Sequence, residues 1–395
     1  MMNNGNTIVG FEFNVKQNMK TLLLLCYIIL AILGFVVCKF LFSTYSEFSG
    51  VNYYVSYIAY FAIGILLSLL FIYYLEEQTI IKISIPGYVI SIVMLLMSLV
   101  LFFLVKPYGQ STPFYFYNSK QLFFFVSGVP IGFSPVMLFP LYGLLVAYYC
   151  NKDHKIDERN WRILTLLMII PIIFCLFLYP GAAIVLFFSF AFTVIALKRV
   201  KKITVSWKRL VLAIIVGCLL LIIFLLFVSD SRMFYRERLQ SILAFGENDP
   251  LGVGWYREAI GRVIEKSRFV GSCVSSTYRG IYSLYNAGGF TLVIILARFG
   301  WLALICCLLI MGMMLVLTIV IVRDIKYDSF SKYVAVFSVS FLCCQTVLNI
   351  VGVALLDTGF MDLPFVSPNK NLAITDMIFL ALVIRAHRND RENNH

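Results

Sequence analysis

Residues 208–228 read KRLVLAIIVGCLLLIIFLLFV and decide the class of fold. After Lys208 and Arg209, no charged residue occurs up to Val228. That length matches the roughly 20 apolar residues that a helix needs to cross a bilayer. The whole chain of 395 residues has the same character, with 61% hydrophobic and 13% charged residues, whereas soluble domains carry about 25% charge. The sequence therefore predicts a membrane protein.

Similar apolar runs recur along the chain between short polar stretches. The first run starts near Thr21, is too long for the core of a signal peptide and has no small-residue cleavage site after it, so we expect it to remain as a span. The eighth run is too long for one simple span, and we expect a short helix or re-entrant piece before Gly300. We predict an all-α polytopic fold of about ten transmembrane helices, at residues 21–43, 53–75, 87–105, 133–150, 162–179, 181–197, 208–228, 290–322, 332–355 and 371–386.

Basic residues gather in alternate short loops, which indicates orientation because cytoplasmic loops are enriched in Lys and Arg. The basic loops lie at 152–159, 198–209, 323–332 and 385–391, whereas residues 43–52 contain no Lys or Arg. We therefore expect a multi-pass membrane protein with both termini in the cytoplasm. The predicted regions are a tail at 1–20, spans one to seven at 21–228, a large extracytoplasmic loop at 229–289, spans eight to ten at 290–386 and a tail at 387–395.

The large loop between spans seven and eight is longer than most connections, and such loops are usually functional. It mixes many basic and acidic residues. One interpretation is an amphipathic helix, Trp255–Lys266, that lies on the membrane surface. The other is a basic cradle for a pyrophosphate-linked lipid, because arginine side chains match phosphate oxygens.

The remaining composition narrows the function. The net charge of +12 is spread over loops rather than gathered into a soluble domain, so we expect no nucleic-acid partner. Nine of the ten cysteines fall in or beside apolar runs, and only Cys273 lies in the large loop. With no metal-ligand spacing, the sequence predicts no metal site and no cofactor.

Two stretches resemble one known family. Residues 238–256 read RLQSILAFGENDPLGVGWY, and a second stretch holds Gln345, Asn349, Thr358-Gly359, Leu363-Pro364-Phe365 and Ser367. They resemble the SEDS family (FtsW, RodA and SpoVE), which has R-I…F-x-x-P…D-P-x-G-x-G-Y-Q in its large outer loop and Q…N-I…T-G-x-x-L-P-F-x-S further on. The order, separation and ten-span topology agree over most of the chain.

The resemblance implies a role in peptidoglycan assembly during division, elongation or sporulation. It implies binding of membrane lipid and of lipid II or a related undecaprenyl-pyrophosphate-linked precursor, beside a single-span class B penicillin-binding protein. Active members are glycosyltransferases that polymerise lipid II. The substrate-binding residues that it suggests are Arg236, Arg238, Asp249, Pro250, Gly252, Gly254, Gln345, Asn349, Thr358, Gly359, Pro364 and Ser367.

The chain departs from the family at its polar working positions. Gly289 stands where active members keep an essential aspartate. Extending a glycan requires a base for the acceptor hydroxyl and charge stabilisation for the departing pyrophosphate, and glycine supplies neither. We therefore favour a divergent member whose transferase activity is reduced, relocated or absent, acting as a scaffold or regulator.

Asp357 and Asp362 are candidates for a relocated base, because their predicted loop faces the same side as the large loop. The alternative, which we favour, is turn chemistry, since aspartate stabilises tight turns. Arg298 and Asp376 are ionisable residues within predicted spans, and we expect them to pair or to line a cavity. Gln345 and Asn349 lie on one helix face, for interhelical hydrogen bonds or a central cavity.

Two other functions fit the outline. A flippase or transporter of an anionic lipid-linked substrate would suit the internal charges and basic loop, although no inverted repeat is evident. An O-antigen-type polysaccharide polymerase is also polytopic with a large outer loop. The two motif stretches favour the SEDS interpretation over both.

Overall fold

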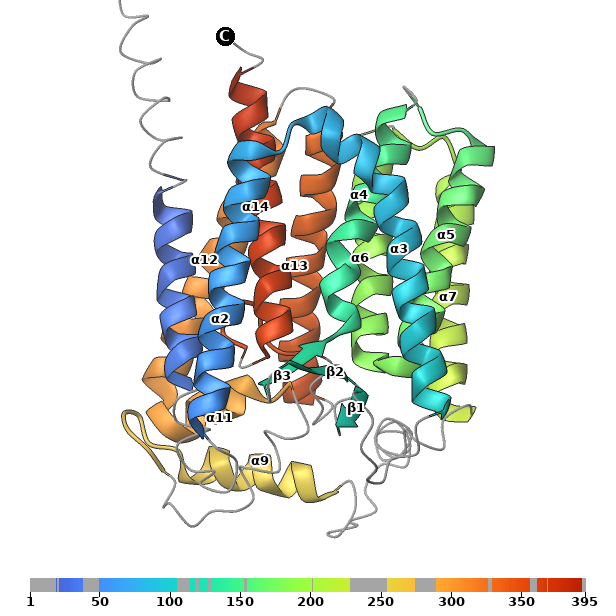
Figure 1. Ribbon diagram of the computed structural model, residues 1–395. Helices are drawn as coiled ribbons and strands as arrows, with labels where there is room; N and C mark the ends of the chain where they lie inside the picture. The colour runs from blue at the N-terminus through green and yellow to red at the C-terminus, as the bar shows by residue number, and fades with distance from the viewer. Residues whose placement is uncertain are drawn as a thin grey trace, which may run out of the picture.

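The computed structural model describes most of the membrane-embedded part of the chain. It covers residues 19, 21–37, 50–104, 114–117, 121–126, 129–152, 155–200, 202–227, 254–273, 289–325, 329–355, 361–367 and 369–392. Within these residues the chain forms a bundle of long, roughly parallel and antiparallel helices (Figure 1). A helix at Thr21–Val37 is followed by α2 (Gly50–Leu69), a π-helical turn η1 (Leu70–Tyr74), α3 (Glu77–Leu104), a 3₁₀ turn η2 (Pro135–Leu138), α4 (Phe139–Lys152), α5 (Glu158–Leu178), α6 (Pro180–Arg199), α7 (Trp207–Phe227), α9 (Gly254–Lys266), α11 (Thr291–Phe299), α12 (Trp301–Asp324), α13 (Phe330–Leu355) and α14 (Lys370–Glu392).

The polytopic helical fold is confirmed, and the count of ten spans stays a prediction. Helices overlap each predicted span, but only seven in the described residues are both long and apolar enough to cross a membrane. The helix at Thr21–Val37 and α4 are shorter, and α14 carries charged residues in its last turns. The seven are Tyr57–Tyr74, Glu77–Val100, Glu158–Leu178, Pro180–Arg199, Trp207–Phe224, Trp301–Asp324 and Phe330–Ala354.

A small antiparallel sheet connects α3 to α4, which the sequence did not predict. Its strands are β1 (Phe114–Tyr117), β2 (Gln121–Val126) and β3 (Val129–Phe133), in the order β1-β2-β3. The sheet lies with α9 at the end of the bundle opposite the C-terminal end of α14 (Figure 1).

Helix α13 forms the centre of the bundle and packs against α4, α6 and α14. The Phe341 ring lies 5.6 Å from that of Phe139 and 4.5 Å from that of Phe379, centroid to centroid. Gly143 allows α4 to approach α13 closely, because a Cβ at Gly143 would lie 2.7 Å from the ring of Phe337 on α13. Lipid tails are as apolar as these side chains, so close van der Waals packing holds the helices together.

The expected break before Gly300 is confirmed, because the segment divides into α11 and α12 at this residue. Gly300 has φ 86° and ψ −178°, a region that is essentially restricted to glycine. A Cβ at this position would also lie 2.6 Å from the carbonyl oxygen of Arg268. The change of direction and the close passage of residue 268 therefore both depend on glycine.

Helix α9 lies where the sequence predicts the amphipathic helix of the large loop, and its place on the membrane surface stays a prediction. Its buried residues Ala259, Ile260 and Val263 form one apolar cluster with α11 and with Val353 of α13. The apolar face is used for packing within the protein. The charged residues Glu258, Arg262 and Lys266 remain exposed.

Candidate functional site

The structure describes half of the predicted site residues. Asp362, Gly254, Gln345, Asn349, Pro364, Ser367, Arg298 and Asp376 are described. The predictions at Asp357, Arg236, Arg238, Asp249, Pro250, Gly252, Thr358 and Gly359 lie outside the described residues.

Asp362 belongs to the loop between α13 and α14, and its side chain contacts the start of α11. Its Oδ1 accepts hydrogen bonds from the Gly289 backbone N–H at 2.7 Å and from the Thr291 hydroxyl at 3.2 Å. Its Oδ2 accepts one from the Ser367 hydroxyl at 2.8 Å. A carboxylate is favourable here because the N-terminus of a helix carries positive partial charge. Asp362 is therefore hydrogen-bonded to Gly289, the residue that we expect to replace the family aspartate.

The Asp362 carboxyl is buried together with its partners. Burial raises the pKa of Asp362 above the usual range of a carboxyl, because the charged form loses its hydration. The hydrogen bonds from Ser367, Gly289 and Thr291 favour the ionised form and offset part of this rise.

Gln345 and Asn349 reach the same loop from one face of α13. The Gln345 Nε2 donates to the Asp362 backbone oxygen at 2.9 Å. The Asn349 Nδ2 donates to the Gly289 oxygen at 2.8 Å and to the Met361 oxygen. Both side chains are fully buried. They hold the backbone of the two loops together, and a substrate-binding role for them stays a prediction.

Ser367 and Pro364 belong to the same loop. The Ser367 hydroxyl also accepts from the Asn369 N–H at 2.8 Å, and its backbone oxygen accepts from the Tyr57 hydroxyl at 3.3 Å. Pro364 begins the turn that places Phe365 at φ 62°, a left-handed conformation that is rare for an aromatic residue. The loop is thus held in one shape by contacts with α2, α13 and α14.

Asp376 of α14 supports this strained turn. Its Oδ2 accepts a hydrogen bond from the Phe365 N–H at 3.1 Å. The structure places this fully buried carboxylate against the loop, and the expected pairing or cavity-lining role of Asp376 and Arg298 stays a prediction. Arg298 lies in the last turn of α11 and is partly exposed.

The contact between Asp362 and Gly289 was missed in the sequence, although one signal pointed to it. Three residues separate Gly359 from Leu363, and the family pattern T-G-x-x-L-P-F has two. Asp362 is the last of the three. An added residue that is acidic and adjacent to a matched motif is a reason to look for a compensating contact.

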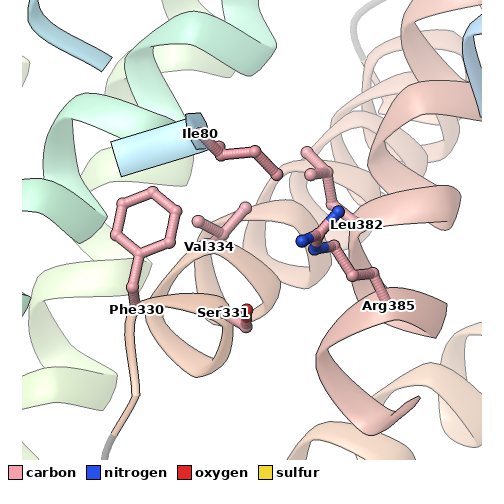
Figure 2. A pocket seen from close by; sticks show the side chains of 6 residues that line it. All are labelled: Ile80, Phe330, Ser331, Val334, Leu382 and Arg385. Atoms are coloured by element: carbon pink, nitrogen blue, oxygen red, sulfur yellow. The ribbon is translucent and has the colours of Figure 1, made fainter. Parts of the chain in front are cut away.

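A small cavity lies at the opposite end of the bundle, near the C-terminal end of α14. It has a volume of about 10 Å³, enough for roughly one water molecule. Its lining is apolar except for Arg385 and Ser331, as Figure 2 shows. Arg385 is held there by a hydrogen bond to the Phe71 oxygen at the π-helical turn. The cavity is too small for a lipid-linked substrate.

The comparisons with known proteins agree with this fold. The family model for the FtsW, RodA and SpoVE cell cycle proteins matches residues 20–392, so the chain belongs to this family. No curated protein matches the sequence.

Solved structures show the same architecture. A chain from a peptidoglycan synthase complex, described for its structural coordination of polymerization and crosslinking, superimposes with a TM-score of 0.66 at 20% identity, covering 93% of this chain and 97% of that one. The rod shape determining protein RodA of Thermus thermophilus gives a TM-score of 0.58 at 16% identity, with 93% and 96% coverage. A mutant of the same RodA gives 0.59 at 17% identity, again with 93% and 96% coverage.

Proposed function

We propose that this protein binds lipid II, or a related undecaprenyl-pyrophosphate-linked precursor, without polymerising it, and serves as a scaffold for a partner in peptidoglycan assembly. The partner that we propose is a single-span class B penicillin-binding protein. The observation that carries the proposal is the buried contact of the Asp362 carboxylate with the Gly289 N–H.

The chemistry of polymerisation argues against a base at this place. A general base must reach the proton that it removes, directly or through one water molecule. Gly289 has no side chain, and both carboxylate oxygens of Asp362 already accept hydrogen bonds in a buried setting. In this proposal Asp362 ties the start of α11 to the loop before α14.

The orientation is part of the same proposal. We place α9, the sheet and residues 229–289 outside the bacterial cytoplasmic membrane, with both termini in the cytoplasm. Two observations support this: the basic short loops alternate along the sequence, and α9 lies at the end opposite the C-terminal end of α14 (Figure 1). The precursor headgroup would then meet Arg236 and Arg238 of the outer loop.

The test uses the full-length protein in proteoliposomes with fluorescent lipid II, alone and with its penicillin-binding partner. We expect lipid II binding that weakens in the Arg236→Gln/Arg238→Gln variant and is unchanged in Arg209→Gln, an exposed arginine at the start of α7. Binding that is absent, or equal in the two variants, would contradict precursor recognition. Glycan product would contradict the scaffold role.

A further inference from the structure

The segment that follows α9 passes the junction of α11 and α12 and is held there by four backbone hydrogen bonds. The N–H groups of Trp301 and Leu302 donate to the oxygens of Arg268 and Phe269 at 3.1 and 3.0 Å. On the other side of the junction, the N–H groups of residues 271 and 273 donate to the oxygens of residues 299 and 297, both at 3.1 Å. The segment 268–273 is therefore fixed at the first turn of α12.

This position sets the level of the segment relative to the bilayer. Trp301–Asp324 is the most apolar of the seven candidate spanning helices and has 24 residues. Because about 20 residues cross the hydrocarbon layer, we place its first residues at one edge of that layer. Trp301 suits that place, because tryptophan is enriched at membrane interfaces. Since Phe269 bonds directly to Leu302, Phe269 lies at the same edge.

Two large apolar side chains are exposed in this fixed segment. Phe269 is 66% exposed and Val270 is 62% exposed; we call this pair the apolar tip. On α12, Leu302 and Ile305 are also exposed, and they begin the outward face of the helix that continues through Leu309. The tip thus extends an apolar surface that already faces lipid.

Basic residues flank the apolar tip. Lys266 ends α9, Arg268 directly precedes Phe269, and both are exposed. Exposed apolar groups beside basic residues at the membrane edge are typical of segments that enter the headgroup region of anionic lipids.

We propose that the apolar tip inserts into the lipid leaflet at the α9 end of the protein, with Lys266 and Arg268 contacting anionic headgroups. The tip anchors the end of the large loop to the membrane at the α11–α12 junction. Helix α9 does not serve as the anchor, because its own apolar face is buried against α11 and α13.

The experiment places the photoreactive residue benzoylphenylalanine at position 269 of the full-length protein in nanodiscs with equal phosphatidylglycerol and phosphatidylcholine. The matched control carries the same residue at Glu265, which is exposed on α9. We expect lipid adducts, detected by mass spectrometry, at position 269 and few at position 265. We also expect phosphatidylglycerol to be enriched among the adducts, and this enrichment to disappear in a Lys266→Gln/Arg268→Gln variant.

Three results would overturn the proposal. The first is a lipid adduct yield at position 269 no higher than at position 265. The second is cross-linking of position 269 to a second copy of the chain or to a co-reconstituted partner protein in place of lipid. The third is an adduct population without preference for the anionic lipid, which would remove the role of Lys266 and Arg268.

Discussion

The carboxylate of Asp362 accepts a hydrogen bond at 2.7 Å from the backbone N–H of Gly289, 73 residues earlier in the chain. This contact places an acidic residue beside Gly289, where the resemblance predicts that the family aspartate is missing. The same acid also ties the start of α11 to the loop before α14 through Thr291 and Ser367. A carboxyl group is therefore kept in this region, but its contacts are those of a structural residue.

Removing the Asp362 carboxyl should destabilise the protein. Asp362→Ala leaves the Gly289 N–H and two hydroxyls without an acceptor in a buried place, and we expect a loss of about 2–4 kcal/mol. Asp362→Asn keeps an acceptor oxygen and should lose about 1 kcal/mol. Thermal unfolding in detergent, with the wild type alongside, measures both. Equal stability of Asp362→Ala and the wild type would show that the contact is dispensable.

The stability of the protein should depend on pH through Asp362. Burial raises its pKa above the ordinary value of 3.8, so above that value the folded protein holds a proton that the unfolded chain has lost. The contribution of Asp362 to the free energy of unfolding is therefore full below its pKa in the unfolded chain. It falls as the pH rises through the raised pKa of the folded protein. The difference in unfolding midpoint between wild type and Asp362→Asn, measured from pH 4 upwards, should change in this direction. A difference that stays constant with pH would contradict the raised pKa.

Restoring the family aspartate at position 289 should conflict with Asp362. Gly289 has φ 79°, which disfavours any other residue by about 1–3 kcal/mol, and the new carboxyl would face an existing one. We expect Gly289→Asp to lower the unfolding midpoint strongly. Adding Asp362→Asn should recover part of the loss, because it removes the like-charge repulsion. Strictly additive effects in this double-mutant cycle would show that the two sites are not coupled.

Gly300, which precedes α12, should tolerate no side chain, whereas Gly312 within α12 should. A Cβ at Gly300 meets the Arg268 oxygen at 2.6 Å, and the backbone there suits only glycine, so Gly300→Ala should cost about 2–4 kcal/mol. A Cβ at Gly312 meets nothing within 4 Å, and alanine favours helix, so Gly312→Ala should be neutral or slightly stabilising. Equal unfolding midpoints for the two variants would contradict the close crossing at Gly300.

The spans were predictable from the sequence because the signal is local. An apolar run such as 208–228 must be helical in lipid, where every backbone group needs an internal partner. The break at Gly300 was likewise visible in a run too long for one helix. These features depend on neighbouring residues alone.

The site was less predictable because its contacts join distant segments. Nothing close in sequence to Asp362 indicates that it contacts Gly289, or that Asp376 contacts Phe365. The pattern of α9 showed an apolar face correctly, but not that α11 and α13, rather than lipid, cover it. The nearest signal in the sequence was one extra residue, relative to the family motif, in the stretch between Gly359 and Leu363 that ends in Asp362.

The most direct test of the central claim is gel analysis of glycan formed from lipid II by the full-length protein with the proposed penicillin-binding partner, comparing the wild type with Asp362→Asn. We predict that bound lipid II is recovered unpolymerised from both proteins. Glycan made by the wild type and lost in a stably folded Asp362→Asn would contradict the account, because Asp362 would then be a catalytic base.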